Sequence, residues 1–425
     1  MYKVTELIIK FYKSKDMKFL LFFRDTFKIL LKGGKSYYAW VLFLVLLIAW
    51  GFGGYINQLR DGLQATNMTD SVSWAFYIGN FTFLVGVAAA AIMLVIPAYI
   101  YNWKPIKEIV IFGELLAITA VVLCIGFIMV DIGKPHKFWH MLPLVGTMNF
   151  PDSILAWDFF VLAFYFLLNL FIATYLLYCY YYKQEYKKSL VLPLILLSIP
   201  AAVAIHTITA FLFNAMPARP FWNSALLAPR FLASAFCSGP AILIILFQVL
   251  RKTTKFEIKN EVLWTIAELM VYAMFIYLFF SIAEYFKEFY SDTEHLVYWK
   301  YLLFGLGEHK ELVPFSWVSI ILGTTAFILF LFPKTRKNLL TLNIGAVMIY
   351  FSVYIEKGMA LIIPGFTPDV LGQINVYVPS INEIRITAMI FSLGALLFTF
   401  MVKVAISIIF ENNNVDKSTS VEAIV

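Results

Sequence analysis

The sequence has little charge and few residues that hold metal clusters. Only 14% of its 425 residues are charged, whereas 61% are hydrophobic and the mean hydropathy is +0.81. This balance lies far outside the range of soluble domains and predicts a protein that crosses a membrane several times. The three cysteines, Cys124, Cys179 and Cys237, stand singly in apolar segments without a C-x-x-C pair. We therefore expect no cysteine-held iron–sulfur cluster and no covalently attached haem.

Histidine is also scarce, and its placement argues against a haem between helices. A transmembrane b-type haem needs two imidazoles that face each other inside the bilayer. Of five histidines, only His206 lies well inside an apolar run, and His136, His140, His295 and His309 fall in connections. The sequence has no glycine-rich phosphate loop and no H-E-x-x-H motif. We therefore expect no haem, no iron–sulfur cluster and no metal in this chain.

Long apolar runs are abundant, and each reaches the ~20 residues that a bilayer-spanning helix requires. We expect ten helices, at about 37–59, 73–101, 105–132, 153–182, 189–213, 228–251, 260–286, 313–333, 337–357 and 384–410. The predicted fold is therefore an all-α polytopic membrane protein. Spans two to five and six to nine are expected to form two four-helix bundles in the same orientation, about 73–213 and 228–357, flanked by spans one and ten.

The distribution of Lys and Arg predicts the orientation. When the N-terminus is placed inside, most of these residues fall on the inner segments, so both termini are expected to be cytoplasmic, in the plasma membrane. Residues 1–36 alternate basic and apolar side chains and are expected to form an amphipathic arm on the anionic leaflet. The membrane domain is expected to run over 37–410, with 411–425 as a cytoplasmic tail. The long connections then face outward.

The most polar interruption in the first half of the chain is Asp131–Asp158, DIGKPHKFWHMLPLVGTMNFPDSILAWD. Asp131 ends one span, and Asp158 lies just inside the next, past a predicted N-cap at Ser153. Ionisable groups at this depth are costly, so they are functional candidates by default. The alternative is an ordinary amphipathic loop, with Trp139 and Trp157 as interfacial aromatic residues.

Polar side chains inside the spans are few and fall on helix faces. Span four carries Asp158, Tyr165 and Asn169 on one stripe at helical spacing. The buried acids are expected either to relay protons or to form interhelical hydrogen bonds in their protonated form. The candidates for a proton pathway are Glu114, Tyr165, Asn169, Glu268 and Glu284. The polar candidates near the outer ends of spans two and five are Tyr77, Asn80 and His206.

Several runs resemble the NrfD/polysulfide reductase membrane-subunit family. Asp131–Trp139, DIGKPHKFW, is similar to its D-[LI]-G-[RK]-P-x-x-[FW]-W signature, with Lys134 where many members have Arg. Ala156–Phe159 is similar to its S/A-W-D-F run. Ala233–Pro240 and Arg219–Trp222 fit the ten-span branch, which includes DsrP and HmeB-type subunits of sulfite-reduction-associated complexes. The resemblance covers roughly residues 37–410.

The resemblance implies a quinone-reactive subunit of a respiratory oxidoreductase complex, without a redox cofactor of its own. It implies electron exchange between menaquinone or ubiquinone, menaquinone being preferred, and an extracytoplasmic ferredoxin-like iron–sulfur subunit. A multihaem cytochrome c and further membrane subunits are expected partners, together with membrane lipid, and no nucleic acid. The expected catalytic groups are Asp158, His140 and Asp131. The expected quinone-binding groups are Tyr77, Asn80, Trp139, Trp157 and His206.

Two other functions compete with this interpretation. In a proton-coupled secondary transporter, Glu114, Glu268 and Asp158 would bind substrate or protons. Such transporters usually have helices broken by Gly or Pro at the midplane, and the prolines here cluster at span ends and in loops. A purely structural anchor for partner subunits would not need carboxylates inside the membrane.

Overall fold

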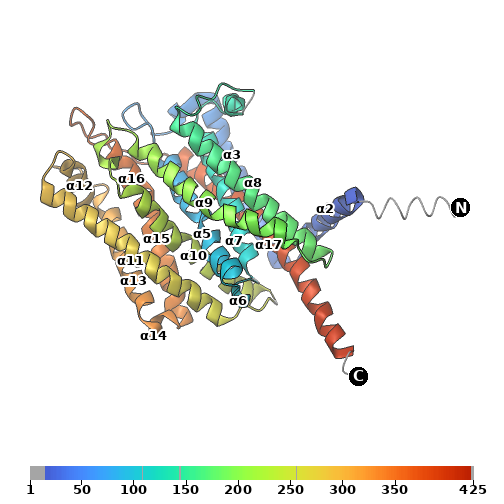
Figure 1. Cartoon of the computed structure of the whole chain (residues 1–425). Coiled ribbons are helices and arrows are strands. Elements are labelled where there is room, and N and C mark those ends of the chain that lie inside the picture. The colour runs from blue at the N-terminus through green and yellow to red at the C-terminus, as the bar shows by residue number, and fades with distance from the viewer. Residues whose placement is uncertain (1–14, 108, 143–144, 255, 423–425) are drawn as a thin grey trace.

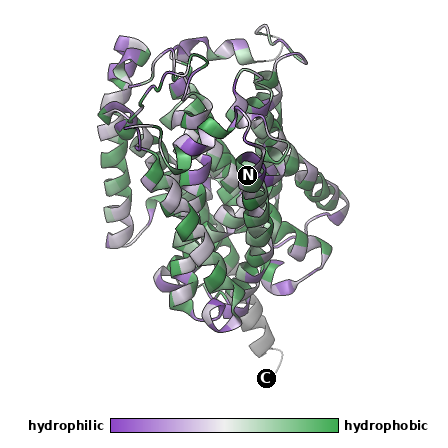
Figure 2. Cartoon of the chain, turned by 90° about the vertical axis from the view of Figure 1, so that its left-hand side faces the viewer, coloured by the Kyte–Doolittle hydropathy of each residue, from purple (hydrophilic) through white to green (hydrophobic). Residues whose placement is uncertain are grey.

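The structure, a computed structural model, describes residues 15–107, 109–142, 145–254 and 256–422, so residues 1–14 of the predicted arm lie outside the described residues. Within this part of the chain there is no strand, and one isolated bridge joins Leu306 and His309. Ten helical segments among the described residues are long and apolar enough to cross a membrane. The predicted all-α, ten-span fold is therefore confirmed. Hydrophobic residues fill the middle of the molecule and polar residues gather at its two ends (Figure 2).

The helices follow the predicted order, and every predicted span has a counterpart. The spanning segments are α3 (Lys35–Asp61) with η1 (Gly62–Ala65), α4 (Phe76–Ala88) with α5 (Ala90–Val95) and η2 (Ile96–Ile100), α7 (Val110–Asp131), α8 (Ile154–Tyr181), α9 (Lys188–Asn214), α10 (Leu227–Thr253), α11 (Asn260–Ser291), α13 (Val313–Leu331), α15 (Leu339–Lys357) with α16 (Met359–Ile362) and η5 (Ile363–Gly365), and α17 (Ile381–Glu422). The remaining helices are α2 (Lys15–Leu31), α6 (Lys104–Lys107), η3 (Pro135–Met141), η4 (Pro220–Trp222), α12 (Leu296–Leu303) and α14 (Pro333–Arg336).

Spans two to five contact one another as one group and spans six to nine as another, and α10 of the second group also packs on α4 and α9 of the first. In the first group α4 packs on α7, and α8 packs on α9. In the second group α10 packs on α11 and α15, and α13 packs on α15. The flanking helices α3 and α17 pack on each other, and α17 also packs on α7. Helix α7 is central, with 78% of its apolar stretch buried, whereas 17% of that of α3 is buried because α3 lies at the periphery.

The second span is interrupted in its middle, which the sequence analysis did not anticipate. Helix α4 ends at Ala88 and α5 begins at Ala90. The carbonyl oxygen of Ala88 accepts a hydrogen bond from the Tyr165 hydroxyl at 3.0 Å. A backbone carbonyl inside a membrane protein needs such a partner, so α8 stabilises the break. Alanine is a strong helix former, and its presence at a break gave no warning in the sequence.

Helix α2 packs at the end of the bundle that carries the short connections. Phe22 of α2 is buried, and its ring lies 5.5 Å from that of Tyr181 at the end of α8. The Tyr181 hydroxyl also donates to Asp25 at 2.8 Å. The described part of the predicted arm thus contains a helix, α2, that is held against the bundle along one face, and its other face exposes Phe19, Leu20 and Phe27. Helix α17 continues to Glu422, so the predicted tail is helical through that residue (Figure 1).

Trp222 joins the two groups at the opposite end, which carries the longer connections and is called the long-loop end below. The side chain is fully buried, and its indole nitrogen donates to the carbonyl oxygen of Leu361 at 2.8 Å. Its ring lies 5.1 Å from Phe213 of the first group. A Cβ atom on Gly365 would lie 2.0 Å from this indole, so only glycine fits there.

Candidate functional site

A cavity of about 630 Å³ lies at the long-loop end of the first group, and we call it the first cavity. Helices α4, α7, α8 and α9 and the connection that contains η3 form its walls. The walls are mainly apolar, and the polar side chains among them include Asp131, His140 and Asp158. A slot of this size with a few convergent polar groups is typical of a site for a small molecule.

The start of helix α8 positions Asp158 in this cavity. Ser153 is the N-cap, and its hydroxyl accepts from the backbone N–H of Ala156, as predicted. Asp158 follows a little over one turn later and is only 3% exposed. The hydroxyl of Thr209 on α9 donates to its Oδ1 at 2.7 Å. This hydrogen bond orients the carboxyl group of Asp158 at the cavity wall.

Asp131 and His140 face the same cavity from the other side of the connection. Asp131 is the last residue of α7, and its Oδ1 is buried without a hydrogen-bond partner among the described residues. A buried polar atom without a partner requires an explanation, and a bound ligand supplies one. His140 is exposed, and its ring stacks on Trp139 with centroids 3.7 Å apart. The structure therefore brings together the three expected catalytic residues.

Tyr77 and Asn80 lie behind the cavity wall instead of in it. The Tyr77 hydroxyl donates to Gln58 at 2.8 Å, and Gln58 in turn donates to the carbonyl oxygen of Val130 at 2.6 Å. The Asn80 side chain accepts from the Tyr354 hydroxyl at 2.9 Å. Both residues are buried and have hydrogen bonds to neighbouring helices. Tyr77 and Asn80 therefore hold the helices that form the cavity wall and do not face the cavity themselves.

The other three predicted quinone-binding residues are also outside the cavity lining. Trp139 and Trp157 are exposed, and the Trp157 indole donates to the carbonyl oxygen of Pro151 at 2.8 Å. His206 is fully buried, with Nδ1 2.7 Å from the carbonyl oxygen of Ala202 one turn earlier. Its Nε2 has no hydrogen-bond partner within the described part of the chain.

The predicted proton-pathway residues fall into two places. Glu114 on α7 and Tyr165 on α8 are both buried between helices that pack on each other, and Asn169 donates to the carbonyl oxygen of Tyr165 at 2.8 Å. Glu268 instead is exposed and forms a 3.5 Å ion pair with Arg336. Glu284 lies in the second group, paired with Arg230. The structure thus does not join Glu268 and Glu284 to the other three.

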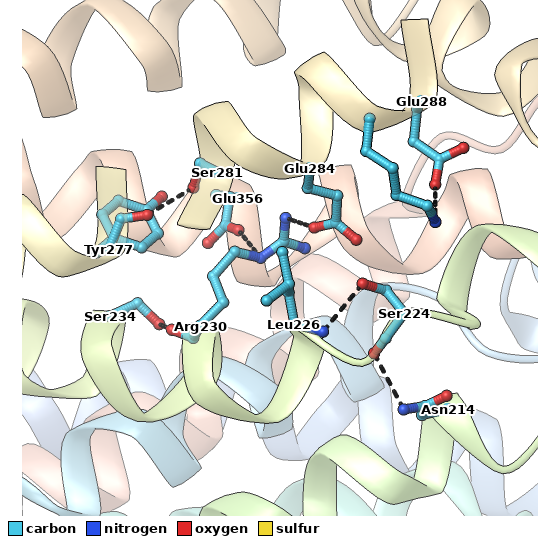
Figure 3. A network of polar contacts seen from close by, with 11 residues as sticks. Asn214, Ser224, Leu226, Arg230, Ser234, Tyr277, Ser281, Glu284, Glu288 and Glu356 are labelled. Carbon is cyan, nitrogen blue, oxygen red and sulfur yellow. Dashed lines mark hydrogen bonds and ion pairs between the residues drawn. The ribbon is translucent and has the colours of Figure 1, made fainter. Parts of the chain in front are cut away.

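The second group contains a buried charge cluster that the sequence analysis missed (Figure 3). Arg230 is 6% exposed, and its guanidinium forms ion pairs with Glu284 and, at 3.4 Å, with Glu356. The ammonium of Lys357 is also buried and donates to the carbonyl oxygen of Phe231 at 2.8 Å. Arg230, Glu356 and Lys357 stand at the ends of apolar runs, where the sequence alone does not distinguish a loop charge from a buried one. The sequence signal that could have indicated this cluster was the position of an arginine, a glutamate and a lysine close to predicted span ends.

The fold and the site define a class of protein. It is a multi-pass, all-helical membrane protein whose first helix group contains, at one end, a mainly apolar cavity with a few polar side chains. The chain belongs to the polysulphide reductase NrfD family, whose profile matches residues 64–368. The family resemblance inferred from the sequence motifs is therefore confirmed. Residues 131–139 and 156–159 both lie within the matched region.

Three relatives extend this comparison. A Halobacterium salinarum protein, provisionally named as a membrane component of dimethyl sulfoxide reductase, is 24% identical over 84% of this chain and 88% of its own length. A selenate reductase subunit from Mesobacillus selenatarsenatis is 25% identical over 61% of this chain and 67% of its own. The Hdr-like menaquinol oxidoreductase integral membrane subunit of Archaeoglobus fulgidus is 24% identical over 88% and 96%.

Proposed function

We propose that this chain is the quinone-reactive membrane subunit of a respiratory oxidoreductase complex. The observation that carries the proposal is the first cavity, in which Asp131, His140 and Asp158 converge on a mainly apolar space. The names of the three relatives describe membrane or other subunits of reductases and of a menaquinol oxidoreductase. The name of the Archaeoglobus fulgidus relative supports menaquinone as the substrate.

The residues of the cavity suit a quinone. An isoprenoid quinone needs an apolar slot for its ring and tail, and hydrogen-bond partners for its two oxygens. Asp158 would serve one oxygen, because its carboxyl group is held by Thr209 and lies at the cavity wall. His140 or Asp131 would serve the other, since the Oδ1 atom of Asp131 lacks a partner among the described residues.

Proton exchange would be the contribution of this chain to the reaction, because a quinol releases two protons when it is oxidised. A carboxyl group accepts and releases a proton at the oxygen that faces the ligand, and an exposed imidazole passes it to solvent. Asp158 and His140 both line the first cavity, and His140, which is exposed, would pass the proton to solvent. Glu114, Tyr165 and Asn169 lie deeper and are candidates for a proton path across the membrane.

The electron partner would be an extracytoplasmic ferredoxin-like iron–sulfur subunit docked over the long-loop end. The connections there are long and chemically varied, and both chain ends would then lie in the cytoplasm. Further partners would be a multihaem cytochrome c and other membrane subunits. Within the family we propose the ten-span branch of DsrP and HmeB-type subunits, linked to sulfite or sulfate reduction, because the number of spans fits it.

Asp158→Asn tests the proposal. Asparagine keeps the size and one acceptor of Asp158 but cannot exchange a proton. We expect the complex to assemble with normal iron–sulfur content, and menaquinol-dependent turnover to fall by about 10²-fold or more, the scale for loss of an acid–base group. The matched control is Asp152→Asn, a loop carboxylate that is exposed and outside the cavity lining. Normal turnover in an assembled Asp158→Asn complex would remove Asp158 from the mechanism.

A further inference from the structure

A second cavity, of about 670 Å³, occupies the equivalent place in the second helix group. The first cavity lies between the second and third spans of its group, α7 and α8, beside the connection that joins them. The second cavity lies between α11 and α13, beside the connection that contains α12. Because the two groups share chain order and direction, this correspondence is what an internal repeat would produce.

The second cavity opens toward the bilayer. Its lining includes Phe275, Phe279 and Ile282 of α11, which are 62%, 58% and 63% exposed in the isolated chain. These residues lie within a spanning helix, where exposed apolar side chains face lipid. On the α13 side, Trp317 and Ile328 are also lining residues that are exposed. A hydrophobic molecule dissolved in the bilayer therefore has direct access to this cavity.

The buried side of the cavity has a specific polar chemistry. Arg230 and Glu356 both contribute to its lining, and Figure 3 shows the ion pair between them. The guanidinium of Arg230 already faces two carboxylates, Glu284 and Glu356, so the cluster carries no excess positive charge for an anionic headgroup. The Oε2 atom of Glu356 is buried and accepts no hydrogen bond from the residues that the structure describes. The site thus offers a free acceptor and disfavours a phosphate.

We infer that the second cavity binds a second molecule of the same class, a neutral isoprenoid quinol or quinone, whose hydroxyl donates to Glu356. The tail would lie between α11 and α13, where the lining is apolar. This inference rests on the proposed function, since it takes the quinone chemistry of the first cavity as its starting point. It assigns the second site binding only and no electron transfer.

Photolabelling of the intact complex in lipid nanodiscs tests the inference. The probe is an azido-naphthoquinone with an isoprenoid tail, and labelled peptides are mapped by mass spectrometry. We expect label in residues 125–163 and also in residues 275–328. Thr324→Trp places an indole in the cavity lining and should lower the second labelling about tenfold or more, because overfilling removes the space for the ligand. Ile320→Trp, also in the lining, should act in the same way.

The matched control is Ile321→Trp, on the same helix and exposed to lipid but outside the cavity lining. It should leave both labelled regions unchanged, and excess menaquinone but not excess phosphatidylglycerol should compete with the probe. Label confined to 125–163, or displaced from 275–328 by phosphatidylglycerol, would overturn the inference and leave the proposed function intact. Turnover of the Asp158→Asn complex reports on the proposed function separately, because Asp158 contributes to the first cavity alone.

Discussion

Removal of the Arg230 charge should destabilise the second helix group far more than removal of a surface charge. In Arg230→Met, Glu284 and Glu356 lose the guanidinium that now compensates them in a buried environment. Burying a carboxylate without a partner is costly, because the protein interior replaces none of the hydration that it loses. The cost of the substitution is therefore that Glu284 and Glu356 both lose the charge of Arg230, which is larger than the loss of a single contact.

The size of the effect follows from the burial of the cluster. Arg230 and Glu284 side chains are 7% and 3% exposed, so solvent screens their interaction little. Breaking a buried pair by removing one partner costs about 3–5 kcal/mol, whereas replacing all members by neutral groups is often nearly neutral. We expect Arg230→Met to lower the unfolding midpoint by roughly 3–6 °C. The triple variant that adds Glu284→Gln and Glu356→Gln should recover most of this loss.

The assay is a thermal melt of the purified protein in detergent, followed by fluorescence-detected size exclusion. Arg60→Met is the control, because Arg60 pairs with Asp61 with a side chain that is 74% exposed and such a surface pair adds little stability. An Arg230→Met protein as stable as the wild type would refute the argument that burial makes this cluster costly to break. A triple variant no better than the single one would refute the role of the two carboxylates.

Two further predictions concern orientation and the N-terminal helix. Cysteines placed at Lys137 and Lys252, both exposed, should react with a membrane-impermeant maleimide from opposite sides of the membrane, and labelling of both from one side would contradict the proposed orientation. The pKa of Asp25 is held below its ordinary value by the hydrogen bond from Arg24 first and that from Tyr181 second. A lowered pKa stabilises the docked α2 at pH values above the unfolded-state pKa, and this effect is lost as pH falls. The protection of residues 15–31 from hydrogen exchange, corrected for the intrinsic exchange rate at each pH, should therefore fall below about pH 4. Asp25→Asn should show the faster exchange already at pH 7, and unchanged exchange in that variant would remove Asp25 from the docking.

The family and the number of spans were determined by the sequence itself. A run of about 20 apolar residues has few alternatives to a transmembrane helix, because the bilayer leaves no water for unpaired backbone groups. The motif Asp131–Trp139 and the N-cap at Ser153 depend on local order and were recognised without any tertiary information. Helical periodicity also placed Asp158, Tyr165 and Asn169 on one buried face, as the structure has them.

Only the tertiary structure decided which polar residues share a site. Periodicity gives the face of a helix but not the helix that it meets, so Thr209 as the partner of Asp158 and the separation of Tyr77 from the cavity came from packing. The same limit applies to Arg230 and Glu356, which stand at the ends of separate apolar runs. Whether a charge at a span end is solvated or buried depends on neighbouring helices distant in the sequence, because those neighbours replace water. The second cavity likewise depends on how helices α11 and α13 pack against each other and their neighbours, and no local pattern in either helix encodes it.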